Sequence, residues 1–418
     1  MKAVGLHASP HLTMLSAKAF QNKQLIASGM LARCEPHDPK TEVARSIWPR
    51  PSKSRRCQSP DAHGELPFMT STTDALRSRI AGVPRTPLAH LPTPLELLLR
   101  FSKAVSANGP RVWIKRDDCT GLLMGGNKAR HNEFLIGDAL AKGANMVVWG
   151  AGVQSNNCRQ TAAACAKVGL DIHLVLGRGR PANGPDVVQG NLLLDQIVGA
   201  SFEIVEESVG PGLDRKIAEV AERFRSQGRK VYLWDRKIVL PLAALSYALC
   251  MAEIVEQSAV SGFEPAAVYV SSAGSTGAGV ALGAKALGLR YPVKSIAPMI
   301  WPWDSREELS ATANRAAELA GLDTRLTPDD ILFDDSQLSP GYGAPSDAGL
   351  EAMTLLARTE GILVEHVYTA KALAGLIAHI RAGQFHADQD IVFIHTGGTP
   401  AIFADAEMLA IRIPRRTL

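Results

Sequence analysis

Residues 146–167 have the sequence MVVWGAGVQSNNCRQTAAACAK, and this stretch decides the fold class. Its first four residues are apolar and rich in valine, which is typical of a buried β-strand. Small and polar residues follow, and Cys158 to Lys167 then form an alanine-rich segment that favours a helix. Ser155 or Asn156 can cap this helix, because both side chains accept hydrogen bonds from the first N–H groups of a helix. The stretch therefore predicts a strand, a polar loop and a helix, in that order.

The same order recurs along most of the chain. Asn132 to Lys142 is predicted as a second helix, which Gly143 would end. Repeated strand–helix–strand order predicts parallel α/β sheets. Strands are predicted at residues 112–115, 146–149, 172–176, 202–205, 230–234, 267–271, 293–297 and 391–395.

The composition is that of an ordinary globular protein. Of the 418 residues, 46% are hydrophobic and 21% are charged. The formal net charge is +4, but residues 1–68 alone carry five lysines and five arginines against five acidic residues, a balance of +5. The other residues therefore carry a net charge of −1, which gives no charge pattern for nucleic acid or a membrane surface. No run approaches the roughly 18 uncharged apolar residues of a transmembrane helix, so we expect no membrane span.

Residues 1–68 lack sustained hydrophobic periodicity. Residues 33–64 are rich in proline, serine, histidine and charge, a composition that cannot bury enough apolar surface to offset its ordering entropy. The apolar run after Lys2 is broken by His7 and Pro10, so it does not match a secretory signal. We interpret residues 1–68 as a disordered basic extension that precedes an ordinary protein start at Met69.

A chain that begins at Met69 should therefore fold and act normally. The reason is that the extension supplies no apolar surface to the core. Soluble yield and activity of the truncated and full-length proteins test this expectation. Loss of soluble protein on truncation would refute it.

The six cysteines show no Cys-x-x-Cys pair and no zinc-ligand spacing. Six cysteines in a chain of 418 residues are also too few for a disulfide scaffold. We therefore expect reduced thiols, a cytoplasmic protein and no metal site.

Four loops follow predicted strands and are rich in small or polar residues. In open α/β sheets, ligands bind outside the carboxyl ends of the strands. The sequence therefore predicts that these loops form a common site. The loops are residues 115–130, 150–160, 271–279 and 395–400.

The first loop ends in Gly125-Gly126-Asn127-Lys128 at the start of a predicted helix. The positive end of a helix favours the neutral, nucleophilic form of a nearby amine. Lys128 could therefore bind a phosphate or form a Schiff base with an aldehyde. A solvated surface charge is the alternative for a lysine at this place.

The third loop has the sequence SSAGSTGAG over residues 271–279. Small residues let successive N–H groups converge on an anion, and the following helix adds its dipole. The loop lacks a Gly-Lys-Ser/Thr sequence and the G-x-G-x-x-G spacing, so a cradle for a single phosphate is the better match.

The other polar loops leave two interpretations open. Residues 150–160 could hold a small zwitterionic substrate or could simply cap the next helix. Thr396 could meet a ring nitrogen or a carboxylate, or could only form a turn. Tyr342 lies between glycines and prolines in residues 339–345 and could be a site residue or a packed side chain.

The order of these motifs resembles the D-cysteine desulfhydrase and 1-aminocyclopropane-1-carboxylate deaminase family. These are fold-type II pyridoxal-phosphate enzymes, similar in fold to the tryptophan synthase β subunit. The resemblance covers about residues 85–405. It is carried by residues 115–130, QSNNCRQTAA at 154–163, GYGAP at 341–345 and HTGGTP at 395–400.

The resemblance implies two parallel-sheet α/β domains with pyridoxal phosphate in the cleft between them. The large cofactor domain would comprise residues 75–130 and 243–418, and the small domain residues 131–242. A homodimer is also implied.

The resemblance also implies roles for individual residues. Lys128 would form the Schiff base with the cofactor, Asn156 would bind the ring hydroxyl, and Thr396 would meet the ring nitrogen. Ser155 and Tyr342 would face the substrate, Ser155 for proton transfer or carboxylate binding and Tyr342 for polar contact or acid–base work. The phosphate would lie on the backbone of Ala273, Gly274, Ser275, Thr276 and Gly277.

The activity implied is α,β-elimination on a small amino acid, giving pyruvate and ammonia. D-Cysteine desulfhydrase is the first hypothesis, and L-cysteate sulfo-lyase and 1-aminocyclopropane-1-carboxylate deaminase are the alternatives within the class. A pyridoxal-phosphate-binding protein without catalysis is the alternative from another class.

The sequence departs from the pattern of this family mainly on the substrate side. Asn157 stands where the family usually has histidine, and the usual Gly-Gly-Ser motif is absent near residues 234–241. Ala273 and Gly277 stand where serine and glutamine are common. Cys119, which follows two aspartates, resembles the cysteate-cleaving branch.

Overall fold

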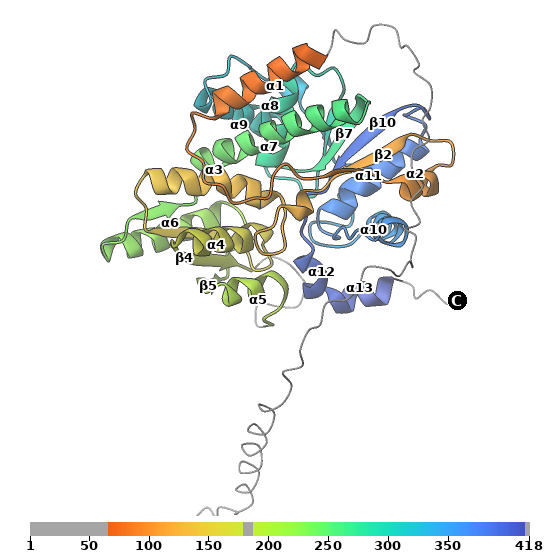
Figure 1. Cartoon of the computed structure of the whole chain (residues 1–418). Coiled ribbons are helices and arrows are strands. Elements are labelled where there is room, and N and C mark those ends of the chain that lie inside the picture. The colour runs from red at the N-terminus through yellow and green to blue at the C-terminus, as the bar shows by residue number, and fades with distance from the viewer. Residues whose placement is uncertain (1–65, 179–186, 414–418) are drawn as a thin grey trace, which may run out of the picture. The chain divides into compact units, whose positions relative to one another are not determined.

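The computed structural model describes residues 66–178 and 187–413 (Figure 1). The first described helix, α1 (Leu66–Ile80), begins three residues before Met69. Residues 1–65, which make up most of the predicted extension, lie outside the described residues. The described residues all belong to one compact unit, 61–418.

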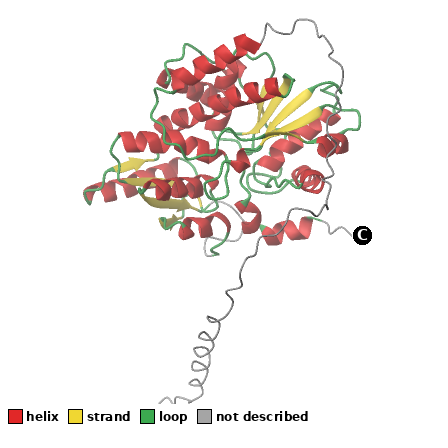
Figure 2. Cartoon of the chain, in the orientation of Figure 1, coloured by secondary structure: helices red, strands yellow, loops and turns green. Residues whose placement is uncertain are grey.

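Two separate sheets form the framework (Figure 2). The larger has six strands in the order β1, β2, β10, β7, β8, β9. All neighbours in it are parallel except β1 and β2, which are antiparallel. Its strands are β1 (Leu95–Leu97), β2 (Arg111–Lys115), β7 (Pro265–Ser271), β8 (Val293–Ile296), β9 (Leu332–Asp334) and β10 (Asp390–Ile394).

The smaller sheet has four parallel strands in the order β5, β4, β3, β6. All of its strands lie between Met146 and Leu233, whereas the larger sheet takes strands from both sides of this segment. The exact domain boundaries stay a prediction. The strands are β3 (Met146–Gly152), β4 (Asp171–Gly177), β5 (Ser201–Val205) and β6 (Val231–Leu233).

All eight predicted strands are confirmed, and so is the parallel α/β class. The prediction missed β1 and β9, because strands of three residues are too short to show periodicity. The two predicted helices are present as α3 (Asn127–Ala141) and α4 (Asn156–Val168). Helix α3 starts five residues earlier than the periodicity suggested, directly after Gly126.

Helices cover both faces of each sheet, and side-chain alternation divides the core accordingly. In β3, Val147 and Trp149 pack with residues of α4, while Met146 and Val148 pack with residues of α6. In β10 the alternate residues likewise belong to two different clusters. The remaining helices are α2 (Leu99–Val105), α5 (Gly190–Ile197), α6 (Pro211–Ser226), α7 (Arg236–Val260), α8 (Ser275–Ala286), α9 (Ser305–Leu319), α10 (Asp347–Glu360), α11 (Thr369–Arg381), α12 (Pro400–Ala404) and α13 (Ala406–Arg412), with the 3-10 turns η1 (Asp117–Cys119) and η2 (Pro328–Asp330).

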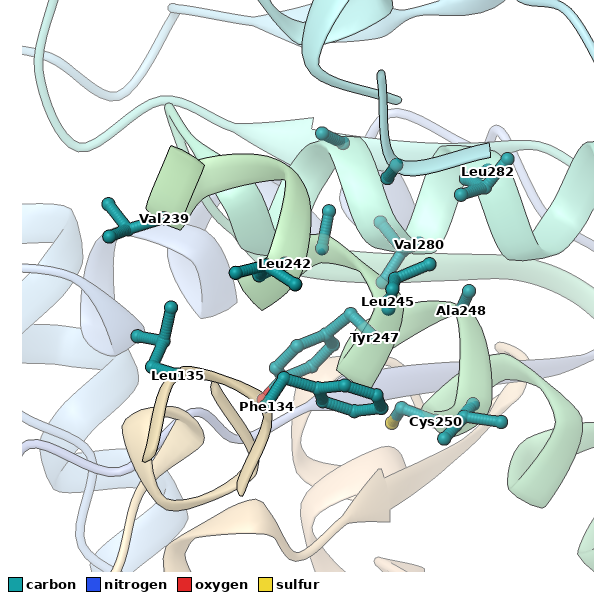
Figure 3. Close-up of a cluster of buried hydrophobic side chains, with 14 of the residues drawn as sticks. Phe134, Leu135, Val239, Leu242, Leu245, Tyr247, Ala248, Cys250, Val280 and Leu282 are labelled. Carbon is teal, nitrogen blue, oxygen red and sulfur yellow. The ribbon is translucent and has the colours of Figure 1, made fainter. Parts of the chain in front are cut away.

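Helix α7 is the central core helix. Its apolar side chains lie between those of α3 and α8, as Figure 3 shows for Phe134, Tyr247 and Val280. Among the described helices it alone is long and apolar enough to cross a membrane, with a mean hydropathy of 2.1. However, 89% of that apolar window is buried inside the protein, as expected of a helix that packs on all sides.

A buried network of charges ties this core helix to the larger sheet. The Arg130 guanidinium on α3 donates to both carboxylate oxygens of Asp117 at 2.8 and 2.9 Å, and to those of Glu253 at 2.7 and 2.8 Å. Lys115 at the end of β2 pairs with Glu253 at 2.7 Å, and the Tyr247 hydroxyl donates to Asp117 at 2.6 Å. The partners hold the pKa of both carboxyl groups below their usual values although burial opposes this.

Glu253→Gln should lower the free energy of unfolding by about 3–5 kcal/mol, because it leaves two buried cations without their shared partner. Equilibrium unfolding in urea measures the change. Glu256→Gln is the matched control on the same helix, since its pair with Arg77 is more than one-third exposed. That substitution should cost no more than about 1 kcal/mol. Equal losses in the two variants would contradict a structural role of the network.

Candidate active site

A cavity of about 400 Å³ lies where the four polar loops meet. Each loop follows a strand, as predicted: the first β2, the second β3, the third β7 and the fourth β10. Gly277 is the one predicted site residue that does not line the cavity. The predicted site residues that do line it are Lys128, Ser155, Asn156, Ala273, Gly274, Ser275, Thr276, Tyr342 and Thr396.

The first and fourth loops touch backbone to backbone. Gly397 has a φ of +82°, and a Cβ built on it would lie 2.6 Å from the Cα of Gly126. The Asn127 N–H donates to the Thr396 carbonyl at 3.0 Å. Glycine is therefore required at 397, both for its backbone conformation and for the close approach.

Arg159 holds the first loop in an unusual conformation. Leu122, Leu123 and Met124 all have positive φ, which costs energy for residues with a Cβ. The Arg159 guanidinium donates to the carbonyl of Leu123 and, at 3.2 Å, to that of Gly125. These bonds fix the loop just before Lys128.

Lys128 extends into the cavity from the first turn of α3. Its side chain keeps some access to cavity water but is surrounded by protein, and this desolvation lowers the pKa of its amine to about 8. Burial disfavours the charged form, so the amine has a much larger neutral fraction near neutral pH than a surface lysine. The structure thus supports a reactive amine rather than a solvated surface charge.

The start of α8 opens on the same cavity, and its N-cap residue, Gly274, makes no side-chain cap. Helix geometry leaves the N–H groups of Ser275 and Thr276 without intrahelical partners. They can therefore bind an anion together with the helix dipole. The N–H of Gly277 differs, because it donates to the Ser272 Oγ at 2.7 Å. Gly277 thus shapes the loop from outside the cavity.

Asn127 and His131 are cavity residues to which the sequence analysis assigned no role. The Asn127 amide donates to the Thr276 Oγ1 at 3.0 Å, and the His131 Nε2 lies 3.2 Å from the same hydroxyl. Burial, together with the nearby cations Lys128 and Arg130, lowers the pKa of His131 well below its usual value, so the ring is neutral. These bonds join the first turn of α3 to that of α8. His131 follows Lys128 by three residues, which places both on one helix face.

Ser155 caps α4. Its Oγ accepts hydrogen bonds from the N–H groups of Asn157 at 3.1 Å and Cys158 at 3.2 Å. The Oδ1 of the adjacent Asn156 accepts from the Asn191 amide at 3.1 Å, which leaves the Nδ2 group of Asn156 to serve as a donor.

Tyr342 pairs with Tyr368, which the sequence analysis did not single out. The two hydroxyl groups share a hydrogen bond, and the rings meet edge to face with centroids 5.9 Å apart. Both tyrosines line the cavity. Glu365 fixes the backbone at Tyr368, because its carboxylate accepts N–H bonds from Val367, Tyr368 and Thr369 at 2.8–2.9 Å.

Thr396 lies directly after the buried His395. Desolvation lowers the pKa of His395, and its two ring nitrogens contact the Leu363 carbonyl at 2.8 Å and the Gly397 N–H at 3.2 Å. A neutral ring protonated on Nε2 satisfies both partners. Among the described residues, none accepts or donates a hydrogen bond at the Thr396 hydroxyl, so it can serve a ligand in the cavity.

These parts define a class of enzyme. A reactive lysine, a helix N-terminus with two N–H groups available for a phosphate and an available hydroxyl surround one cavity, which suits a phosphorylated aldehyde held as a Schiff base. Pyridoxal phosphate has these groups, so the residues present fit this cofactor.

Comparison with known proteins assigns the family. Residues 86–397 match the family described as "Pyridoxal-phosphate dependent enzyme". The chain belongs to the pyridoxal-phosphate dependent enzyme family, and it is a fold-type II member.

The similar proteins include D-cysteine desulfhydrases and a homologue of ACC deaminase. The chain is 39% identical to a D-cysteine desulfhydrase of Salmonella typhi and 38% identical to one of Salmonella choleraesuis, in each case over 77% of this chain and 96% of the relative. The solved structure of an ACC deaminase homologue has a TM-score of 0.72 and 32% identity, covering 81% of this chain and 98% of that chain. Escherichia coli diaminopropionate ammonia lyase, at 15% identity, shares the fold with a TM-score of 0.54 over 82% of this chain and 90% of its own.

The lowered pKa of Lys128 predicts how the cofactor-free protein captures pyridoxal phosphate. The capture rate should rise about tenfold per pH unit below pH 8 and level off above it, because only the neutral amine attacks the aldehyde. Stopped-flow absorbance at several pH values measures this rate.

Lys128→Ala should lose the visible absorbance of the bound cofactor. Lys142→Ala, which removes an exposed lysine from the other end of α3, is the matched control and should keep it. In the capture experiment, a rate of pyridoxal-phosphate capture that keeps rising up to pH 10 would contradict the lowered pKa of Lys128. Unchanged absorbance in Lys128→Ala would remove Lys128 from its role.

Proposed function

We propose that this protein is a pyridoxal-phosphate-dependent lyase that eliminates the β-substituent of a small amino acid, with D-cysteine as its first candidate substrate. The observation that carries the proposal is the placement of the Lys128 amine in one cavity with the start of α8 and Thr396. The D-cysteine desulfhydrases that align with 77% of this chain supply the candidate substrate.

Pyridoxal phosphate supplies an electron sink that stabilises negative charge on the substrate Cα. Lys128 would hold the cofactor and, once released, take the Cα proton, for which an amine with a pKa of about 8 is well matched. Electrons from the broken C–H bond then expel the β-substituent. Hydrolysis of the remaining enamine gives pyruvate and ammonia.

Ser155 is better suited to binding the substrate carboxylate than to removing a proton. Two backbone N–H groups already occupy the lone pairs of its Oγ. Its hydroxyl hydrogen is left to donate, and a carboxylate is the acceptor that a zwitterionic substrate offers. This argument favours one of the two roles that the sequence left open.

The hydrogen-bonded pair Tyr342 and Tyr368 can move a proton at the other side of the substrate. One phenol group can give its proton to a leaving thiolate while the other hydroxyl donates a hydrogen bond to it. We therefore assign general acid work to the pair rather than to Tyr342 alone.

Asn156 and Thr396 would contact the cofactor ring. Asn191 occupies the Oδ1 of Asn156, so the Nδ2 group is the one that can donate to a ring oxygen. A threonine hydroxyl at the ring nitrogen carries no negative charge to hold a proton there, and this favours elimination over transamination. The phosphate would lie on the N–H groups of Ser275 and Thr276, with Ala273 and Gly274 beside them.

A substrate panel tests the proposal. Purified holoenzyme is given D-cysteine, L-cysteate and 1-aminocyclopropane-1-carboxylate, and 2-oxo acid, sulfide and sulfite are measured. Formation of pyruvate and sulfide from D-cysteine, abolished in Lys128→Ala and kept in Lys142→Ala, is the expected result. A visible cofactor spectrum that no amino acid alters would instead support a binding protein without catalysis.

A homodimer and a cytoplasmic location belong to the same proposal. Light scattering on the purified holoenzyme would test the first. All four cysteines in the described part of the chain are free thiols, which agrees with the second.

A further inference from the structure

Three tryptophan rings surround one arginine at the wall of the cavity. Arg236 is the first residue of α7, and its guanidinium lies 5.0 Å from the ring centre of Trp301 and 5.9 Å from those of Trp234 and Trp303. Trp301 and Trp303 stack nearly parallel, at 5.0 Å and 7°. Cation–π contacts of this kind hold a guanidinium flat and fixed in place.

This cluster belongs to the same cavity as Lys128. Arg236 and the three tryptophans all line it. The Trp301 indole donates to the carbonyl of Ala273 at 2.9 Å, so the cluster is joined to the loop that precedes α8. Two of its members, Trp234 and Arg236, lie in residues 234–241, where the sequence departs from the family pattern.

The Arg236 guanidinium has hydrogen-bond donors that are not used within the described residues. Its Nε donates to the Asp214 carboxylate at 2.7 Å, while its two terminal nitrogens have no hydrogen-bond partner among the described residues. The side chain is 25% exposed. Two parallel terminal N–H groups form the fork that binds a carboxylate, sulfonate or phosphate in bidentate fashion.

Arg178 also lines the cavity, and its Nε lies 2.8 Å from the Glu206 carboxylate. Among the described residues, no aromatic ring holds the Arg178 guanidinium, whereas three tryptophans hold that of Arg236. Arg236 is thus the guanidinium best prepared to receive an anion in this cavity.

We propose that Arg236 is a specificity-determining residue whose terminal N–H groups receive a negatively charged group at the end of the substrate side chain. The inference rests on the proposed elimination reaction and extends its candidate substrates to β-substituted alanines with an anionic substituent. A sulfonate, as in cysteate, matches the fork in shape and charge. The Cα proton goes to Lys128, the Cβ–S electron pair leaves with sulfite, and water converts the remainder to pyruvate and ammonia.

The test compares an anionic and a neutral substrate that undergo the same elimination. Both enantiomers of cysteate and of β-chloroalanine are assayed with wild-type, Arg236→Gln and Arg236→Lys holoenzymes. Arg236→Gln should lower kcat/KM for cysteate about 10- to 100-fold, mainly through KM, and change that for β-chloroalanine by less than about threefold. Arg236→Lys should recover only part of the loss, because an ammonium group keeps the charge but not the fork.

Lys237→Gln is the matched control. It removes a positive charge from the neighbouring position of α7, but Lys237 is exposed and does not line the cavity. It should leave both substrates within about threefold of the wild type.

Two results would overturn the inference. One is an equal loss for both substrates with weaker pyridoxal-phosphate affinity, which would assign Arg236 to the cofactor phosphate. The other is a wild-type holoenzyme that eliminates chloride from β-chloroalanine but turns over neither enantiomer of cysteate. That result would overturn the role of Arg236 but would still support the proposed elimination reaction.

If the proposed elimination reaction itself is wrong, the outcome differs from both of these results. If neither substrate is turned over, titration of cysteate against the tryptophan fluorescence of the holoenzyme still decides the inference. Binding that Arg236→Gln weakens about 10- to 100-fold supports it, and absent or unchanged binding overturns it.

Discussion

The buried guanidinium of Arg130 fixes the position from which the reactive lysine acts. It binds Asp117 beyond β2 and Glu253 on α7 through four hydrogen bonds, so α3 cannot move relative to the larger sheet or the core helix without breaking them. Lys128 lies two residues earlier, about 200° around the helix. One face of a single helical turn therefore anchors the fold, and the other presents the amine to the cavity.

The same turn holds two basic side chains in opposite electrostatic conditions. Arg130 has acidic partners that raise its pKa well above its usual value, so its charge is permanent. Lys128 has no such partner among the described residues, and burial alone lowers the pKa of its amine. A carboxylate close to Lys128 would stabilise its charge and reduce its reactivity. The neutral His131, one turn away, satisfies the Thr276 hydroxyl without adding such a carboxylate.

Strands and loops that carry a local signal were predictable from the sequence. The residue types of valine-rich strands, such as residues 146–149, and of the glycine-rich turn before Lys128 predict the local conformation. Tyr368 and Arg236 gave no such signal, because their roles arise from residues far away in the chain. Tyr368 meets Tyr342 across 26 residues, and Arg236 meets Trp301 only because loops from the two sheets converge. Gly277 was placed correctly in its loop, but its N–H is used by Ser272, a detail of local geometry.

The predicted residues lie mainly on the proposed cofactor side of the cavity, and the missed residues lie mainly on its proposed substrate side. In the proposed site the cofactor requires a lysine at a helix start, and this requirement is visible in a short motif. The proposed substrate choice depends instead on the part of the cavity wall where Asp214 of α6, Arg236 of α7 and the tryptophans after β8 meet. Asp214 takes only the Nε edge of Arg236, and the stacked indoles exclude water from its faces without competing for its hydrogen bonds. A guanidinium so held keeps its terminal N–H groups for a ligand and is not free to turn away, which is the condition for discriminating an anionic side chain from a neutral one of similar size.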